Sequence, residues 1–246
     1  MVPTAVKRIL PASVKHPFMA YRSWYWQLRG LPVQSRTDIS IFKEVLSKVG
    51  AETLKVFEWG SGASTVYYSE FLRNIGRPFS WHSADNSKEW SQISQEKIEK
   101  ALLTEQVQIH CSEFPAFWEL PDYSIADPVP PDVYNNSARV KEYVDFPRNL
   151  GGSFEVMIID GRFRRRCLEV AAEVLSPNGI VILHDASRTH YYPPLSLYSH
   201  VQFLKTGPLP GSNHRSCIAL ASLHNNQLIL GFTEKYHDAS RSGEKT

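Results

Sequence analysis

Residues 56–65 read VFEWGSGAST, and this stretch decides the fold. The β-rich run 53–59 leads through an acid, Glu58, into a Gly-Ser-Gly turn at 60–62, after which a helical pattern begins. A strand, a glycine turn and a helix in succession predict a ligand site at the carboxyl end of the strand. The stretch lacks the lysine of a P-loop, and Thr65 follows where a dinucleotide-binding turn carries its third glycine. A nucleoside triphosphate and a dinucleotide are therefore both disfavoured.

Two acids narrow the ligand further. Glu58 would repel a pyrophosphate beside the turn, but it suits a cationic group. The next expected strand ends in Asp85, 27 residues after Glu58, and a carboxylate there can accept both hydroxyls of a ribose. The turn and the two acids together favour a nucleoside with a positively charged, amino-acid-like group. That description fits S-adenosylmethionine.

Strand-like and helix-like segments alternate along the chain. The expected strands are 53–59, 79–85, 107–113, 154–160, 180–185, 200–207 and 216–223. The expected helices are 37–50, 64–76, 87–103 and 162–175. This alternation predicts an α/β fold with a parallel sheet that helices cover on both faces. The last two strands leave no room for a helix between them, so they predict an antiparallel hairpin at one edge.

Local patterns also predict details of these elements. Thr37 or Asp38 is the expected cap of the first helix. Ile75 and Leu102 are expected on the apolar faces of the second and third helices, and SPNG at 176–179 is expected to form a tight turn.

Polar side chains follow the expected strands at the point where each one ends. They are Glu58, Asp85, Ser112, Glu113, Asp160, His184 and Asp185. In a parallel sheet the carboxyl ends of the strands meet at one edge, where ligands bind. The sequence therefore predicts that these residues form a single site.

Three segments resemble the class I S-adenosylmethionine-dependent methyltransferases, over roughly residues 38–222. FEWGSGAST resembles the first motif of that family, and SADNSKEW resembles its second-strand motif. MIIDGRFRRRCLEVAAEVLSPNGIVILHD resembles its fourth strand, the following helix and the entry to strand five. The resemblance implies a Rossmann-like fold with a seven-stranded, mostly parallel sheet in the order 3-2-1-4-5-7-6. It also implies that strand seven is antiparallel.

The resemblance implies a cofactor site at these motifs. The backbone of the glycine turn would contact the amino-acid end of S-adenosylmethionine, Asp85 would hold the ribose, and Asp160 would lie under the methionine. The implied cofactor-binding residues are Glu58, Gly60, Ser61, Gly62, Ser64, Thr65, Asp85, Asn86, Ser112, Glu113, Asp160 and Gly161. Two simpler interpretations stay open: that Glu58 and Asp85 cap the helices that follow them, and that Trp90 is a core residue rather than a neighbour of the adenosine.

Methyl transfer to an oxygen requires that the acceptor lose a proton. The expected catalytic residues are Asp160, His184 and Asp185, whose strands are adjacent, so that the two carboxylates are expected to meet. Cation-dependent relatives carry an Asp-Asn pair at the second position, whereas Ala186 follows Asp185 here. A divalent metal is therefore an alternative that is not favoured, and a general base or simple positioning of the acceptor remain the others.

The arginines at 162 and 164–166 begin a helix, where cations oppose the helix dipole, so acidic partners are expected for some of them. A solvated face is the simplest interpretation of this group. Arg162 has a second one, the pairing of an acidic substrate such as a uronate or phosphate.

The expected organisation is a basic, aromatic N-terminal extension (1–36), a cofactor-binding domain (37–233) and a polar tail (234–246). The domain carries a Pro-rich insertion at about 115–150, whose Trp118, Tyr123, Tyr134 and Tyr143 either stack on an acceptor or pin the loop. Residues 18–31 are interpreted as a helix on the domain, a flap over the site, or a homodimer or membrane-surface contact.

Composition bounds the remaining possibilities. Net charge is +2, which makes nucleic acid an unlikely partner. No apolar run is long enough to span a bilayer, and no secretory signal is recognised. Three cysteines without CxxC spacing predict buried, reduced thiols and a cytoplasmic protein.

The function expected from these observations is O-methylation of a small molecule or saccharide. The alternatives are an inactive cofactor-binding scaffold and a nicotinamide-dependent oxidoreductase.

Overall fold

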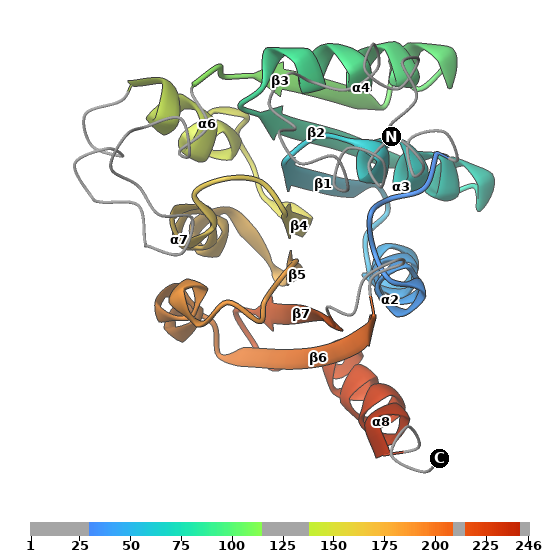
Figure 1. Cartoon of the computed structure of the whole chain (residues 1–246), viewed down its shortest axis with the longest axis vertical. Helices are drawn as coiled ribbons and strands as arrows, with labels where there is room; N and C mark the ends of the chain where they lie inside the picture. The colour runs from blue at the N-terminus through green and yellow to red at the C-terminus, as the bar shows by residue number, and fades with distance from the viewer. Residues whose placement is uncertain (1–29, 115–137, 209–214, 242–246) are drawn as a thin grey trace, which may run out of the picture.

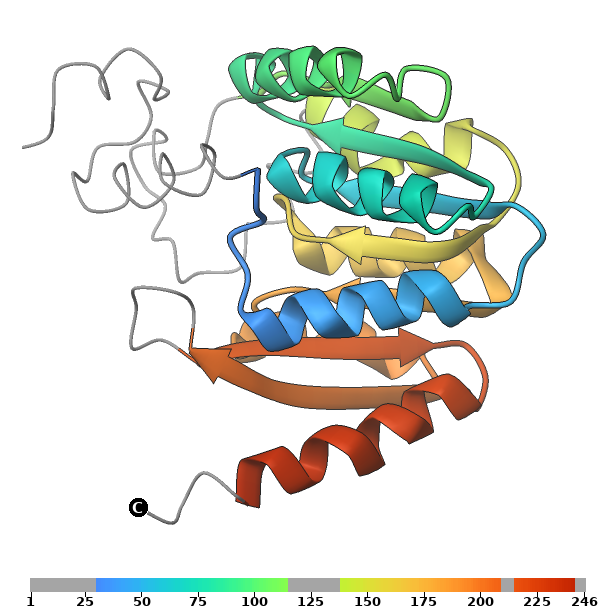
Figure 2. The ribbon, with the colours of Figure 1, turned by 90° about the vertical axis from the view of Figure 1, so that its right-hand side faces the viewer.

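One seven-stranded sheet organises the chain in the order β3-β2-β1-β4-β5-β7-β6. The computed structural model of the protein describes residues 30–114, 138–208 and 215–241. The strands are β1 (Leu54–Trp59), β2 (Phe79–Asp85), β3 (Val107–Cys111), β4 (Phe154–Ile159), β5 (Leu175–Leu183), β6 (His200–Pro208) and β7 (Arg215–Ser222). β1 to β5 are parallel, and β7 is antiparallel to both of its neighbours, as Figure 2 shows. The predicted fold, strand order and antiparallel strand are confirmed.

The register aligns the carboxyl ends of the central strands. Trp59 pairs with Ala84 on β2 and with Ile159 on β4, and Ile159 pairs with Leu183 on β5. Each of these residues is the last or next-to-last of its strand. The loops that follow β1, β2, β4 and β5 therefore start from one line across the sheet, and this line carries the candidate site.

Helices cover both faces of the sheet (Figure 1). One face carries α2 (Arg36–Lys48), α3 (Ala63–Asn74), α4 (Lys88–Lys100) and α8 (Gln227–Arg241). The other carries α6 (Ala138–Asn149), α7 (Arg164–Val174) and the 3-10 turns η3 (Thr189–Tyr191) and η4 (Pro193–Leu197). A parallel sheet between two helical layers buries both of its faces, which explains the continuous apolar runs of β4 and β5.

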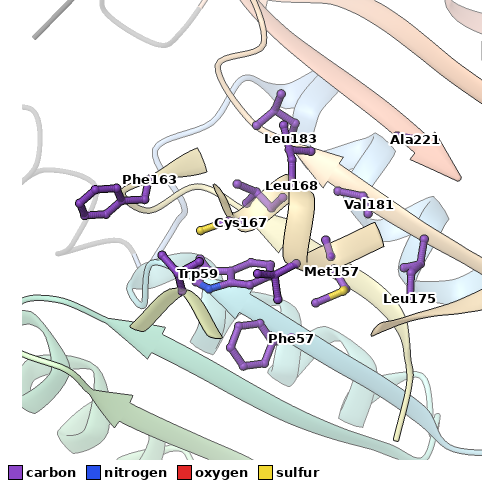
Figure 3. Close-up of a cluster of buried hydrophobic side chains, with 14 of the residues drawn as sticks. Phe57, Trp59, Met157, Phe163, Cys167, Leu168, Leu175, Val181, Leu183 and Ala221 are labelled. Carbon is purple, nitrogen blue, oxygen red and sulfur yellow. The ribbon is translucent and has the colours of Figure 1, made fainter. Parts of the chain in front are cut away.

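Alternate residues of the strands feed two separate cores. Phe57 and Trp59 of β1 join Met157 of β4 in the core under α7, where Cys167 and Leu168 lie close by (Figure 3). Leu54 and Val56 of β1 point the other way, into the core under α2 and α3. Glu58 has the same parity as this second pair, so its carboxylate is buried in an apolar layer unless polar groups surround it.

The ends of the helices correct several local predictions. The cap of α2 is Ser35, not Thr37 or Asp38: its hydroxyl accepts from the Asp38 amide, and the Asp38 carboxylate accepts from the Ser35 amide. Ile75 and Leu102 are 48% and 82% exposed because α3 and α4 end before them, and the chain leaves the apolar face there. The prediction that they face inward is wrong.

The loops differ from prediction in two places. SPNG does not form a tight turn between elements; it lies within β5 as an irregularity, since Phe154 pairs with Leu175 and Val156 already pairs with Ile180. The last part of the predicted Pro-rich loop is the helix α6, which contains Pro147. The rest of that insertion, 115–137 with Trp118, Tyr123 and Tyr134, lies outside the described residues.

The C-terminal segment and one cysteine differ from the predictions. α8 continues through Glu234 to Arg241, so the predicted tail begins as helix, and residues 1–29 lie outside the described residues. Cys167 and Cys217 are buried free thiols as predicted, whereas Cys111 is exposed at the end of the outermost strand, β3. Within the described residues, no helix is long and apolar enough to cross a membrane.

Candidate active site

The glycine turn passes between the ends of three strands. The amide of Gly60 donates to the Ala84 carbonyl of β2 at 2.8 Å, and the Asp160 amide after β4 donates to the Trp59 carbonyl at 3.1 Å. Gly60 has a φ of +100°, and a Cβ placed on it would lie 2.9 Å from the Cα of Gly161. The two glycines thus let the loops after β1 and β4 pack backbone to backbone.

Glu58 fastens the glycine turn to α3. Its carboxylate is fully buried and accepts from the hydroxyls of Ser64 at 2.7 Å and Thr65 at 2.6 Å, and from the Trp81 indole at 3.1 Å. The Thr65 hydroxyl oxygen also accepts from the Gly62 amide at 3.0 Å. Burial disfavours the ionised form and raises the pKa of Glu58 to about 7, although these donors oppose the rise.

This arrangement changes the interpretation of two predicted cofactor residues. The hydroxyls of Ser64 and Thr65 donate to the Glu58 carboxylate, so these side chains stabilise the conformation of the turn. Trp81, which donates to the same carboxylate, was not among the predicted site residues. No local signal distinguishes it from an ordinary core tryptophan, because its contact with Glu58 exists only once β1 and β2 pair.

Asp85 joins the glycine turn to the end of β2. One carboxylate oxygen accepts from the Ser61 amide at 2.7 Å and from the Ser61 hydroxyl at 3.0 Å, and the other accepts from the Ser87 amide at 2.8 Å. Burial raises the pKa of Asp85, and these hydrogen bonds oppose the rise. The cap of α4 is Ser87, whose hydroxyl accepts from the Trp90 amide at 3.3 Å. Asp85 is thus positioned at the turn rather than used as the cap.

The ends of β2 and β3 bring the next predicted residues together. The Ser112 amide donates to the Asp85 carbonyl at 3.0 Å, and Asn86 exchanges two hydrogen bonds of 3.3 Å with the backbone of Phe114. Ser112 is buried, while Glu113 is exposed. Trp90 is half-buried on the first turn of α4, so it is not a core residue.

The predicted catalytic residues also lie together, after β4 and β5. His184 is buried, and its Nδ1 lies 3.0 Å from Oδ1 of Asp160 and 4.0 Å from Oδ1 of Asp185. Its Nε2 is a buried atom without a hydrogen-bond partner among the described residues. Asp185 adopts a left-handed backbone conformation, with a φ of 53°. The imidazole is hydrogen-bonded to Asp160 and lies within ion-pair distance of Asp185.

Opposite charges govern protonation in this cluster. Burial disfavours ionisation of Asp160, but His184 and Arg164 outweigh it and lower the pKa of Asp160 to about 2. Burial likewise disfavours the imidazolium, but Asp160 and Asp185 outweigh it and raise the pKa of His184 to about 9. At neutral pH the pair is therefore an ionised carboxylate against a protonated imidazole.

Arg164 is the buried member of the arginine group, with a side chain only 9% exposed. Its guanidinium donates to Oδ1 of Asp160 at 3.0 Å and lies 4.0 Å from Oδ2 of Asp185. It also donates to the carbonyls of Asp160, Gly161 and His184. A solvated face therefore does not describe Arg164, and the expected acidic partner is Asp160. The position of cations at a helix start was the signal in the sequence, but it did not identify this arginine.

The residues after β4 and β5 do not fit a divalent metal. Oδ1 of Asp160 already accepts from Arg164 and lies beside His184, so both groups between the carboxylates are cationic. The described part of the chain contains no cluster of three or more histidine, cysteine, aspartate or glutamate side chains that could hold a metal ion. Magnesium or calcium would need these carboxylate oxygens as ligands, but both carboxylates already face the guanidinium of Arg164.

Tyr143 supports the site from α6. Its side chain is fully buried, its hydroxyl accepts from the Arg162 amide at 3.1 Å, and its backbone carbonyl accepts from the Trp59 indole at 3.1 Å. A Cβ on Gly161 would lie 2.0 Å from this hydroxyl. The interpretation of Tyr143 as an aromatic that stacks on an acceptor is therefore wrong, because the ring is part of the core.

Comparison with solved structures agrees with the observed fold. An O-methyltransferase from Bacillus cereus in complex with S-adenosylhomocysteine superposes with a TM-score of 0.51 at 14% identity, over 90% of this chain and 98% of that one. The O-methyltransferase TomG from Streptomyces achromogenes, in complex with S-adenosylmethionine, superposes with a TM-score of 0.51 at 12% identity, over 85% and 91%.

The chain has the class I methyltransferase fold.

Spermidine synthase from Thermotoga maritima also has a similar fold, with a TM-score of 0.51 at 12% identity. The match covers 78% of this chain and 61% of that one. No family model and no curated protein matches the sequence. The methyltransferase fold is thus established by topology.

Proposed function

We propose that this protein is an S-adenosylmethionine-dependent methyltransferase that acts on an oxygen of a small molecule or saccharide. The observation that carries the proposal is the glycine turn held between two buried carboxylates, Glu58 behind it and Asp85 beside it. The bound cofactor would supply the electrophilic methyl group, and the protein would position the acceptor against it.

The turn has the features that a nucleoside with an amino-acid group requires. A Cβ on Gly62 would meet no atom within 4 Å, so the described residues leave open space at the turn where a ligand can approach the backbone. Three hydrogen bonds occupy three of the roughly four acceptor positions of the Asp85 carboxylate, so one remains for a ribose hydroxyl, rather than the two that the sequence predicted. These features support the assignment of the turn to the amino-acid end and of Asp85 to the ribose.

His184 is the proposed general base, with Asp160 as the group that orients it. The Asp160 carboxylate holds Nδ1, which leaves Nε2 as the ring nitrogen proposed to take a proton. Because Nε2 is buried in the protein without ligands, the acceptor hydroxyl would have to displace the groups that cover it. Because the pKa of His184 is about 9, the imidazole is available as a base only in its minor neutral form at pH 7. We therefore propose that the rate of methyl transfer rises with pH. Arg164 and Asp185 flank the pair formed by His184 and Asp160.

Calorimetry with S-adenosylmethionine and S-adenosylhomocysteine tests the cofactor assignment. Binding in the micromolar range is expected for the natural protein, and Asp85→Ala should weaken it by about tenfold or more, since one buried charged contact is worth at least 1.4 kcal/mol. The matched control is Glu96→Ala, which removes a carboxylate that is 68% exposed on α4 and should change nothing.

Asp85→Ala also releases Ser61, and a second variant separates the two effects. Ser61→Ala removes the hydroxyl contact to Asp85 and keeps the amide contact, so it should cost much less affinity than Asp85→Ala. Equal losses in both variants would mean that Asp85 only shapes the turn. Folded natural protein that binds neither ligand would overturn the proposal altogether.

A further inference from the structure

Two carboxylates, Asp160 after β4 and Asp185 after β5, lie near the guanidinium of Arg164. We propose that Arg164 takes the place of a divalent cation between Asp160 and Asp185, so that this site needs no metal and cannot bind one. The inference rests on the proposed function only in treating this cluster as the acceptor side of a methyltransferase. Its metal content can be measured without cofactor or acceptor.

The guanidinium lies where a bridging cation would lie. One of its terminal nitrogens is 3.0 Å from Asp160, and the other is 4.0 Å from Asp185, so a single group faces carboxylates from two adjacent strands. A magnesium or calcium ion needs oxygen ligands at about 2.0–2.6 Å. An ion at that distance from both carboxylates would sit against the guanidinium, and the two charges would repel.

Backbone contacts fix the guanidinium in this position. Its Nε donates to the Gly161 carbonyl at 3.0 Å, one terminal nitrogen donates to the Asp160 carbonyl at 2.8 Å, and the other donates to the His184 carbonyl. The ring of Tyr191 lies 5.5 Å from the guanidinium carbon. Rotation of Arg164 away from the cluster would break several charge-assisted hydrogen bonds in a buried site, so displacement by a metal is costly.

The charges of the cluster are balanced without a metal. Asp160 and Asp185 carry two negative charges, and the Arg164 guanidinium faces both of them. Arg188 adds a second cation 3.5 Å from Asp185. The two arginines balance the two carboxylates, so a divalent ion would add an excess of positive charge to the cluster, which is unfavourable.

Titration with manganese chloride, followed by calorimetry and by thermal shift, tests the proposal in the protein without other ligands. The natural protein should show no manganese binding with a dissociation constant below about 1 mM, and EDTA should leave its melting temperature unchanged. Arg164→Ala removes the guanidinium that faces both carboxylates, so it should bind manganese at least tenfold more tightly than the natural protein. Addition of Asp160→Asn to that variant should abolish the gain.

Two further variants show whether the effect belongs to the position of Arg164. Arg166→Ala, on the same turn of α7 but paired with Glu169 at 2.7 Å, should behave like the natural protein. Arg164→Lys restores a cation at the site and should suppress the manganese binding gained by Arg164→Ala. A merely structural role of Arg164 would alter stability in these variants but would not create a metal site.

Each outcome decides the proposal. Micromolar manganese binding by the natural protein that Asp160→Asn abolishes would overturn it, and so would an Arg164→Ala variant that binds no more tightly than Arg166→Ala. If Arg164→Ala does not fold, the titration of the natural protein and of its Asp160→Asn variant still decides. Failure to bind S-adenosylmethionine would refute the proposed function and leave this result standing, so the two are distinguishable.

Discussion

The contact between Gly161 and Tyr143 allows a quantitative test of how the site is held together. In Gly161→Ala the new Cβ would lie 2.0 Å from the Tyr143 hydroxyl, and an ordinary contact begins near 3.4 Å. The two groups must separate by the difference, 3.4 − 2.0, or about 1.4 Å. Tyr143 is fully buried, so its ring can move only by displacing the residues packed around it. The same Cβ would lie 2.9 Å from the backbone of both Trp59 and Gly60, so the chain cannot give way there either.

The expected loss of stability is about 1.5–4.5 kcal/mol. Overpacking of a dense core costs about 1–3 kcal/mol. Displacement of the Tyr143 hydroxyl also breaks the hydrogen bond that it accepts from the Arg162 amide, and such a bond is worth about 0.5–1.5 kcal/mol. For a chain of this size each 1 kcal/mol lowers the melting temperature by about 2–4 °C, so a decrease of about 3–18 °C is expected.

Urea unfolding of a double-mutant cycle measures the effect. Tyr143→Phe removes the hydroxyl that collides, so Gly161→Ala should cost at least 1 kcal/mol less in the Tyr143→Phe background than alone. Gly50→Ala is the matched control, since its Cβ meets nothing within 4 Å, and it should change stability by no more than about 0.5 kcal/mol. A coupling energy of zero between Gly161 and Tyr143 would refute the reasoning.

Three more predictions concern Glu58, Gly62 and His184. Below pH 4.5 Glu58 is protonated in both states, but between pH 4.5 and about 7 only the unfolded chain ionises, so the natural protein should lose about 3 kcal/mol of stability over that window. Urea unfolding at pH 5 and pH 7.5 measures this loss, which should be absent in Glu58→Gln. An equal change in the free energy of unfolding in the natural protein and the variant would contradict the prediction. Gly62→Ala should fold within about 1 kcal/mol of the natural protein, because its Cβ enters open space, yet it should weaken S-adenosylhomocysteine binding about tenfold or more in calorimetry. The value of kcat/KM should rise from pH 7 to about 9 as His184 loses its proton; a flat profile, or one unchanged in His184→Gln, would exclude His184 as the base.

The sequence by itself determined the architecture and the location of the site. The alternation of apolar strands with amphipathic helices specifies a covered parallel sheet, because such strands can be buried only between two helical layers. The glycine turn at 60–62 and the acids that end β1 and β2 are also local signals. Turn chemistry is encoded in a few adjacent residues, so these features can be found without knowledge of the fold.

The tertiary structure decided which groups meet. Four arginines begin or precede α7, and only the packing of its first turn against the end of β5 selects Arg164 for the buried position between Asp160 and Asp185. Tyr143 belongs to a segment whose composition predicts a loop, and its place under Gly161 depends on how α6 docks on the sheet. The contacts of Arg164 with Asp185 and of Gly161 with Tyr143 join different elements, so they depend on how those elements pack, which the sequence pattern does not reveal. For the same reason the sequence indicated a pair of strand-end carboxylates, and only the folded chain showed which cation they share.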